Sequence, residues 1–429
     1  EFAGRGAADV LALVLLALGD DGSEGGEIRG PKLADVATAT AGCRLAAQVT
    51  SYTVLDAAIA AHARVLAALQ MLLCRDEQAA AAEEVAADDE LVAAAAEALV
   101  FACMRSNAVK HTVLLTLGRS GLLAAAIGRA SSASTLSRLL NLLRAIASTE
   151  PTGDVREALA PEISALVVQS IQRFPQDRDV QRWGLASLGA LAANDGAYAQ
   201  HVGESGLACA CWALRADALA DIMLVQQEAL FCVHSMLPAC RESLKDGGKD
   251  LAGLVAGSVS RGLRQGAAGE ENTVWGLRVF ERLCASRRGP SALTPFANVL
   301  VEAMVSPFLC PAAAEAGSAA ASLMAGGSPT AKQRLAPHRT RLSKALSELA
   351  WKTGEAKGRG CKDERELQEW AKVIMELLGE WKTTQDDGDE FMDMHTSFTV
   401  ASEKKAAEQA AKEQKEEKEE WKKRRASQV

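Results

Sequence analysis

The sequence predicts an all-helical protein built from a repeated unit, and three observations carry this prediction. The chain has 429 residues, 48% of them hydrophobic but only 4% aromatic, so its core must be made mostly of Ala, Leu, Val and Ile. Ala and Leu favour helices, whereas strands draw on β-branched and aromatic residues. Between clusters of turn residues, apolar residues recur every three to four positions, which is typical of amphipathic helices. These helical segments also repeat along the chain.

Charge and apolar content exclude some classes of protein. The chain carries 47 Lys plus Arg against 55 Asp plus Glu, a net charge of −8. A protein held on nucleic acid mainly by phosphate contacts has an excess of basic residues, so we expect no nucleic-acid partner. The longest purely apolar run, 10–18, has nine residues, whereas a membrane-spanning helix needs ~20, so we expect no membrane span. A secretory signal is the alternative for this run, but Gly19-Asp20-Asp21-Gly22 is a poor cleavage site and a first helix is preferred.

The ten Cys are scattered through apolar helical segments and do not cluster at the spacings of a disulfide framework. This usage is typical of reduced, buried thiols, and it predicts a cytoplasmic protein, or alternatively part of a cytoskeletal or organellar assembly.

The N-terminal part begins with residues 1–75, which we expect to form Ala-rich helices, possible degenerate repeats without clear landmarks. Residues 76–90 carry seven acidic residues among Ala. This segment is predicted to be an acidic loop or linker, or alternatively a solvated helix, between two parts of the fold.

Residues 91–349 contain the repeats. Aligning the segments gives three apolar columns spaced three residues apart, with steps of 42, 45, 45 and 47 residues between copies. The columns are Ala98, Leu140, Leu185, Leu230 and Leu277; Phe101, Leu143, Leu188, Val233 and Phe280; and Met104, Ile146, Leu191, Met236 and Leu283. A second helix follows each copy after about twenty residues, anchored at Leu122, Leu166, Leu207, Leu254 and Val299. No copy can bury its apolar stripe alone, so we expect neighbouring copies to stack into one continuous core.

One copy resembles an armadillo repeat closely. Residues 180–195 read VQRWGLASLGALAAND and continue to Gly203-Glu204-Ser205-Gly206-Leu207, while that family's pattern reads roughly V-Q-x-x-A-x-x-A-L-x-N-L-A, followed by a loop and a Gly before the last helix. Gly206 would fit the turn and Leu207 the start of that helix. The copy at 225–230 repeats the opening, and Trp275-Gly276-Leu277 repeats Trp183-Gly184-Leu185. The resemblance implies a right-handed armadillo/HEAT-type α-solenoid.

The two Trp-Gly pairs have two interpretations. Either each Trp fills a helix interface in which the small Gly makes room, which is the commoner role of Trp, or the Trp contacts a ligand.

The resemblance also implies a concave groove that holds extended peptides. Nuclear-import adaptors of this family grip basic peptides with a Trp and an Asn four residues apart in each repeat. The matching positions here are Leu99 and Cys103, Asn141 and Ala145, Ala186 and Ala190, Phe231 and Ser235, and Arg278 and Arg282. No copy has the pair, so an import adaptor is excluded by this pattern even if the fold is shared.

Four groove positions are instead the candidate partner-binding residues: Phe231, Ser235, Arg278 and Arg282. The two arginines, with Arg261, Arg264, Arg287 and Arg288 nearby in sequence, would form a basic patch for carboxylates or phosphates of a partner. The alternative is that these arginines are solvated residues between helices.

No motif for catalysis is present: there is no phosphate loop, His-Glu-x-x-His, calcium loop or nucleophile elbow. Cys209-Ala210-Cys211 is the nearest approach to a metal motif, but residues two apart on a helix point to different faces, so a structural role is favoured. We therefore expect no catalytic residue, cofactor or metal.

The C-terminal part has three segments. Residues 362–382 are predicted to form an amphipathic capping helix, with Leu367, Trp370, Ile374, Leu377, Leu378 and Trp381 on one stripe that packs on the last repeat or, alternatively, in a partner's groove. Residues 383–402 are a flexible acidic segment. Residues 403–429 hold nine basic and seven acidic residues, which predicts an exposed charged tail helix.

Within this tail, Trp421, Arg424 and Arg425 are candidate contacts for an acidic surface, and Ser427 is a candidate phosphorylation site because Arg424-Arg425-Ala426-Ser427 resembles sites read by basophilic kinases.

These features predict a non-catalytic scaffold that binds other proteins through its groove and tail. Two alternatives stay open: a structural subunit of a large cytoskeletal, axonemal or organellar complex, and the repeat region of a longer multidomain protein such as a kinase.

Overall fold

The computed structural model describes residues 82–379, except 106, 149–158, 160–161, 195, 241–247, 287 and 358–360. Within these ranges every regular element is a helix and no strand occurs, which confirms the all-α prediction for this part of the chain. The predicted segments 1–75, 383–402 and 403–429 lie outside the described residues. The tail candidates Trp421, Arg424, Arg425 and Ser427 lie there too.

The chain divides into two compact units, one up to Arg282 and the other from Leu283. The helices of the first unit are α4 (Ala82–Arg105), α5 (Asn107–Val113), the π-helical turn η2 (Leu114–Gly118), α6 (Leu122–Arg129), α7 (Ala133–Ala147), α9 (Ile163–Arg173), α10 (Arg178–Asn194), α11 (Gly196–Arg215), α12 (Asp217–Ala220), α13 (Met223–Met236), α14 (Lys249–Arg264), the 3₁₀ turn η3 (Gly266–Gly269) and α15 (Glu270–Cys284).

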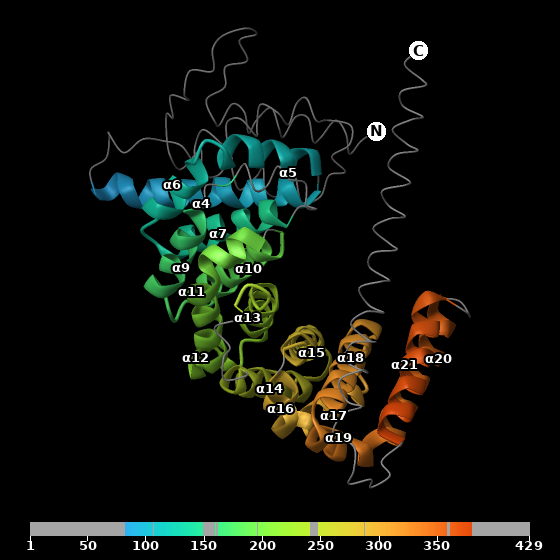
Figure 1. Ribbon diagram of the computed structural model, residues 1–429. Helices are drawn as coiled ribbons and strands as arrows, with labels where there is room; N and C mark the ends of the chain where they lie inside the picture. The colour runs from blue at the N-terminus through green and yellow to red at the C-terminus, as the bar shows by residue number, and fades with distance from the viewer. Residues whose placement is uncertain are drawn as a thin grey trace, which may run out of the picture. The chain divides into compact units, whose positions relative to one another are not determined.

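The helices of the first unit stack in two rows (Figure 1). In the first row, α4 packs on α7, α7 on α10 and α10 on α13, and α15 reaches α13 through a ring contact between Trp275 and Phe231. In the second row, α6 packs on α9, α9 on α11 and α11 on α14. Each row also packs on the other, for example α10 on α9 and α13 on α11, so the core runs continuously between them.

The core between the rows is formed by the predicted apolar columns. Leu140, Leu185, Leu230 and Leu277 are fully buried, one on each of α7, α10, α13 and α15. The column three residues on is buried from Leu143 to Phe280, as is the third from Ile146 to Leu283. The exceptions are both on α4: Phe101 is half-buried, and Met104 is 64% exposed at the C-terminal end of the helix. The column fails there because α4 ends one residue later, where the stack no longer covers it.

Four of the five predicted anchors of the second helices are displaced by one residue, whereas the fifth, Leu207, is half-buried and is followed by the exposed Ala208. Leu122, Leu166, Leu254 and Val299 are only half-buried, whereas the residue after each one is buried: Leu123, Val167, Val255 and Leu300. Because two adjacent apolar residues occur at each place, spacing alone did not decide which faces the core.

The predicted turn at Gly206 is wrong, because α11 is a continuous helix from Gly196 to Arg215 that contains this residue in its interior. Gly206 is buried there and does not have the positive φ found at Gly121, Gly248 and Gly266. Buried glycine within a helix permits close packing of its neighbours, so a glycine in an Ala-rich segment is an ambiguous turn signal.

Residues 82–90 are helical and belong to α4, so the loop or linker interpretation of 76–90 is wrong for this part, and the helix alternative holds. Asp89 is not simply a solvated charge. Its Oδ2 accepts hydrogen bonds from Ser131 Oγ and from the Ser132 backbone N–H at 3.2 Å, and its carbonyl accepts one from Thr135 Oγ1 at 3.0 Å. This carboxylate therefore ties α4 to the N-terminus of α7.

Two glutamines join the rows by satisfying helix ends. Gln181 Nε2 on α10 donates to the carbonyls of Ile171 and Phe174 at 2.8 and 3.0 Å, at the end of α9. Gln226 Nε2 on α13 donates to the carbonyl of Ala213 in the last turn of α11 at 2.9 Å and to that of Leu219 in α12 at 3.2 Å. The last carbonyls of a helix have no partner within it, so a buried amide donor is needed. This requirement explains the Gln of the repeated Val-Gln opening.

The second unit contains α16 (Gly289–Leu293), η4 (Thr294–Phe296), α17 (Ala297–Met304), α18 (Pro311–Gly327), α19 (Pro329–Leu335), η5 (Ala336–His338), α20 (Arg339–Lys357) and α21 (Lys362–Gly379). Here α21 packs on α20 and on α18. Of the predicted amphipathic stripe, Leu367, Ile374 and Leu378 are buried, Trp370 and Leu377 are half-buried, and Trp381 lies outside the described residues. The stripe is thus covered by helices of its own unit.

No single described helix has both the length and the apolar composition to cross a membrane. One pair, 107–118 with 122–129, reaches them only when joined across a bend of 72°.

Candidate functional site

The first unit brings all four predicted groove residues to one place. Phe231 and Ser235 lie on α13, and Arg278 and Arg282 lie on α15. Three of them line a cavity of about 490 Å³; Arg278 does not. The remaining lining residues come from α10, α11, α13, α15 and the turn after α13: Ala192, Ala193, Ala199, Gln200, His234, Pro238, Ala239 and Trp275. We call this the α13–α15 cavity.

An aromatic cluster forms one side of this cavity. The ring centroids of Phe231 and Trp275 are 4.8 Å apart at an interplanar angle of 56°, and those of His234 and Trp275 are 5.4 Å apart. Tilted pairs at these distances are favourable arrangements of aromatic rings. The guanidinium of Arg278 lies over Trp275, 4.7 Å from the ring centroid, in a cation–π contact. Arg278 therefore shields the indole from the outside.

Glycine makes the seat of Phe231. A Cβ atom at Gly189 of α10 would lie 2.6 Å from Phe231 Cδ1 and 3.2 Å from the Cα of Cys232. Because no real Cβ approaches a carbon so closely, the ring of Phe231 occupies the space that a larger residue would fill. Phe231 is thus held between Gly189 on one side and Trp275 on the other.

The polar lining of the cavity consists of a buried hydroxyl, an imidazole, a guanidinium and the amide of Gln200. Ser235 Oγ is buried without a hydrogen-bond partner. Burial, with Arg282 and Arg278 adding repulsion, lowers the pKa of His234 to about 3, so this imidazole is neutral at physiological pH. Arg282 Nη1 donates to the backbone carbonyl of His234 at 3.0 Å, which fixes the guanidinium at the wall.

A second charged group lies further along the first row. The guanidinium of Arg182 stacks on Trp183, 4.0 Å from its centroid, and that of Arg144 on α7 lies 6.0 Å from it. Glu228 on α13 is buried, and burial raises the pKa of its carboxyl, while Arg144 and Arg182 act to lower it and Glu271 to raise it further. These two arginines therefore have a buried carboxylate as their counter-charge.

The Trp and the Gly of each Trp-Gly pair have different neighbours. Gly184 and Gly276 face the second row, where an added Cβ would lie 2.5 Å from Ile171 Cγ1 and 2.1 Å from Val259 Cγ2. Each Trp is half-buried and stacked against an arginine. Trp275 also packs on Phe231 and His234 of α13, so it contributes to a helix interface, as the first interpretation predicts.

The predicted basic patch is smaller than the sequence indicated. Arg261 is not part of it, since its Nη2 donates to the carbonyl of Leu214 at 3.2 Å and to Oε1 of Gln226 at 2.7 Å, between α14, α11 and α13. Arg287 lies outside the described residues. His234, Arg144 and Glu228 belong to the site but were missed. The only available signal was their position on the same helix face as the groove residues.

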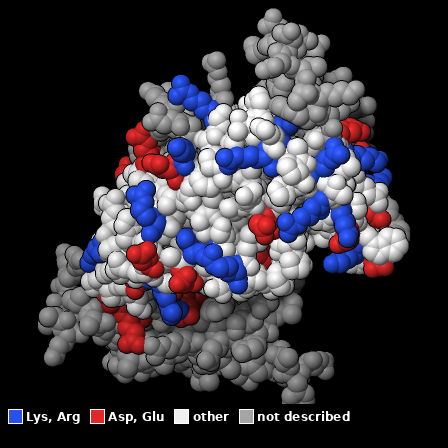
Figure 2. Space-filling view, turned by 90° about the horizontal axis from the view of Figure 1, so that it is seen from below, with Lys and Arg blue, Asp and Glu red and all other residues white. Residues whose placement is uncertain are grey.

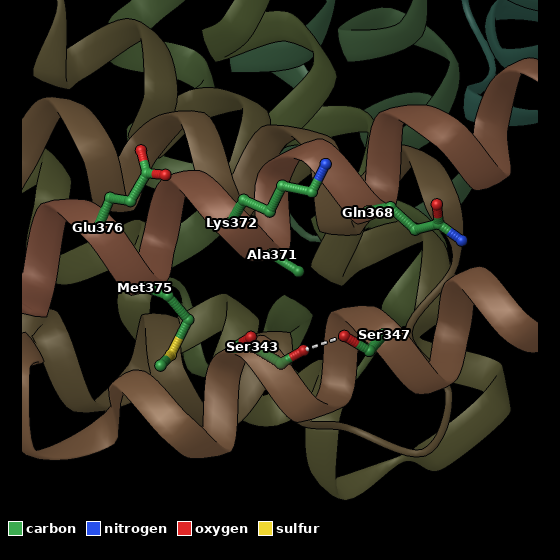
Figure 3. A pocket seen from close by; sticks show the side chains of 7 residues that line it. All are labelled: Ser343, Ser347, Gln368, Ala371, Lys372, Met375 and Glu376. Atoms are coloured by element: carbon green, nitrogen blue, oxygen red, sulfur yellow. Dashed lines mark hydrogen bonds between the residues drawn. The ribbon is translucent and has the colours of Figure 1, made fainter.

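Other hollows lie in the second unit. One of about 420 Å³ lies between α20 and α21, where Ala371 and Met375 point toward Ser343 and Ser347, and Lys372 and Glu376 point away (Figure 3). Ser347 Oγ donates to the carbonyl of Ser343 at 2.9 Å. No described side chain of this hollow has a buried polar atom without a partner. It therefore lacks the unsatisfied donor that distinguishes the α13–α15 cavity.

Cys209 and Cys211 have the features of structural thiols. Burial raises the pKa of each to about 11, so both are protonated at neutral pH and poor metal ligands. In the described part of the chain, no three residues among His, Cys, Asp and Glu are grouped so that they could hold a metal ion.

The charged side chains on one outer face are mixed. Figure 2 shows Lys and Arg scattered over this face with Asp and Glu among them, and uncharged residues over much of the rest. A mixed surface of this kind does not single out one class of charged partner. The arrangement of charge around the α13–α15 cavity is therefore the more specific feature.

The comparisons with known proteins give a match only among solved structures. Neither a protein-family model nor a curated protein matches the chain. Among the solved structures that match is an engineered protein from the Northeast Structural Genomics Consortium, at 16% sequence identity, with a TM-score of 0.48, covering 87% of this chain and 99% of that one.

Proposed function

We propose that the chain is a right-handed armadillo-type α-solenoid and acts as a non-catalytic scaffold that binds other proteins through the first-row face. The support is the stacking of helix pairs in two rows with a repeat of about 45 residues, together with the side chains presented by the first row. Repeat proteins of this kind offer extended surfaces for partners.

The observation that carries the proposal is the convergence of aromatic and cationic side chains from successive first-row helices. Trp183 lies on α10, Phe231 on α13 and Trp275 on α15, and all three are half-buried rings. Binding surfaces are enriched in Trp, Tyr, Phe and Arg at their centres. Solvated side chains would show no such stacking around a cavity. A rigid, preformed surface of this composition is suited to an extended polypeptide.

The proposal includes a cytoplasmic location. Its support is that none of the cysteines that the structure describes lies in a disulfide, and that most of them are buried. Free thiols persist in a reducing compartment.

Site-specific photo-crosslinking tests the proposed function. A benzophenone amino acid is placed at Asn141, a half-buried groove position on α7, or at Trp212, an exposed residue of α11 in the second row. Illumination in native extract should give partner adducts from position 141 and few from position 212. Adducts confined to position 212 would place the binding surface on the second row and contradict the proposal.

A further inference from the structure

The α13–α15 cavity contains a hydrogen-bond donor that the chain itself does not satisfy. Ser235 is 6% exposed, lines the cavity, and its Oγ has no hydrogen-bond partner. Buried side-chain hydroxyls nearly always have a partner, so an orphan of this kind needs an explanation. An acceptor supplied from outside the chain would satisfy it.

The charge of the lining indicates which acceptor fits. The ionisable groups among the described lining residues are His234 and Arg282, and no carboxylate lines the cavity. Arg282 is anchored by its hydrogen bond to the His234 carbonyl, and Arg278 is close enough to depress protonation of the same imidazole. The lining thus offers donors and positive charge.

Apart from Gln200, the rest of the lining is apolar. Phe231 and Trp275 provide ring surfaces, and four alanines and a proline complete the wall. A volume of about 490 Å³ accommodates a side chain or two together with adjoining backbone. An anionic group entering here would lie beside the buried Ser235 hydroxyl, and its hydrogen bond to a guanidinium would be a charge-assisted one.

We propose that the α13–α15 cavity binds the carboxylate of an Asp or Glu side chain in an extended segment of a partner protein. The oxygens of this carboxylate accept hydrogen bonds from Ser235 Oγ and from the Arg282 guanidinium. This inference rests on the proposed function and names the chemistry of the partner. One lining guanidinium matches one carboxylate, whereas a phosphate dianion is typically held by several arginines. Arg144 and Arg182 do not supply that excess, because neither lines the cavity.

Selection from a phage-displayed library of random nonapeptides on the full chain tests the proposal. The expected result is enrichment of peptides that carry Asp or Glu next to an aromatic or large aliphatic residue. The best peptide is then synthesised in three forms, with the acidic residue retained, replaced by its amide, or replaced by phosphoserine. Their dissociation constants are measured by fluorescence anisotropy. We expect the amide to bind about tenfold more weakly or worse, and the phosphoserine form to bind no better than the acid.

Variants assign the binding to the cavity. Ser235→Ala and Arg282→Gln should each weaken the acidic peptide about tenfold while leaving the affinity for the amide peptide nearly unchanged. Ser318→Ala is the matched control for the first, because Ser318 is equally buried and its Oγ also lacks a partner, but it lies on α18 of the second unit. Arg178→Gln is the control for the second, at an exposed arginine that begins α10.

Each contrary outcome has a separate meaning. If the enriched peptides lack acidic residues, or if both variants bind the acidic peptide like the wild type, the carboxylate site is refuted while the proposed function stands. Tighter binding of the phosphoserine form refutes the choice of carboxylate. If no peptide is enriched, the carboxylate site is also refuted, and crosslinking from position 141 then decides separately whether the proposed function falls with it.

Discussion

Replacing Gly189 by Ala tests whether the ring of Phe231 is seated against α10 as described. The new Cβ would lie 2.6 and 2.7 Å from two ring carbons of Phe231. Overpacking of this kind costs about 1–3 kcal/mol, and the higher helix propensity of Ala offsets up to about 1 kcal/mol. We therefore expect Gly189→Ala to lower the free energy of unfolding by about 0.5–2 kcal/mol.

The assay is urea unfolding followed by tryptophan fluorescence, carried out as a double-mutant cycle with Phe231→Ala. Removing the ring frees the space, so Gly189→Ala should be neutral or stabilising in the Phe231→Ala background. The expected coupling energy between the two positions is about 1–2 kcal/mol. Gly257→Ala on α14 is the matched control, because its Cβ would meet only Arg261 Nη1 at 3.6 Å. That substitution should stabilise the chain by about 0.5–1 kcal/mol.

The reasoning fails if Gly189→Ala has the same effect in both backgrounds within about 0.5 kcal/mol, since independent sites add to that accuracy. It also fails if Gly189→Ala stabilises the wild-type chain as much as Gly257→Ala does. Either result would mean that Phe231 does not occupy the space above Gly189.

Three further predictions concern stability and thiol chemistry. Gln226→Ala should lower the free energy of unfolding by about 1–3 kcal/mol in thermal melts, because two buried carbonyls lose their donor. The adjacent Gln227→Ala should change it by less than about 0.5 kcal/mol. Equal effects of the two substitutions would contradict the role of the Gln226 hydrogen bonds in joining the helices. His234 has a pKa of about 3 in the folded chain, against 6.5 for the free side chain. Below about pH 6.5 the unfolded chain therefore binds a proton that the folded chain does not bind. The stability that the neutral imidazole contributes is complete above about pH 6.5 and decreases as the pH falls further. Between pH 7 and pH 5 the wild type should therefore lose about 1 kcal/mol more free energy of unfolding than His234→Gln in urea titrations, an amount reduced by the partial exposure of the ring. Equal losses would refute the lowered pKa of His234. Burial raises the pKa of Cys103 to about 12 and that of Cys209 to about 11. Both thiols should therefore resist a disulfide reagent at pH 8 until urea is added, as mass spectrometry of the labelled peptides would check. Rapid labelling of the folded chain would contradict their burial.

The helical fold could be predicted because the signal was repeated. Leu140, Leu185, Leu230 and Leu277 occur at nearly equal steps, and one buried column per helix follows from stacking. Details that depend on a single residue were harder to predict from the sequence. Leu122 and Leu123 are equally apolar, so only tertiary packing decided that the second faces the core. Gly206 fits both a turn and the interior of a tightly packed helix, and composition does not distinguish them.

The candidate site could be predicted only in part. Aligning repeats found Phe231, Ser235, Arg278 and Arg282, because positions on one helix face recur with the repeat. The alignment could not show that Arg261 donates hydrogen bonds to Gln226 and to the Leu214 carbonyl, since these bonds depend on contacts between the rows. It gave no indication that Ser235 lacks a partner, which is a property of the three-dimensional surroundings and not of the residue type.

Charge reversal across the complex tests the central claim most directly. Arg282→Glu should weaken the enriched acidic peptide by about thirtyfold or more, because attraction between a guanidinium and a carboxylate is replaced by repulsion between two like charges. The same variant should bind a peptide with Lys in place of the acidic residue more tightly than the wild type does, with an unchanged melting temperature as the check on folding. If Arg282→Glu keeps the wild-type preference for the acidic peptide, the carboxylate is not bound in the α13–α15 cavity.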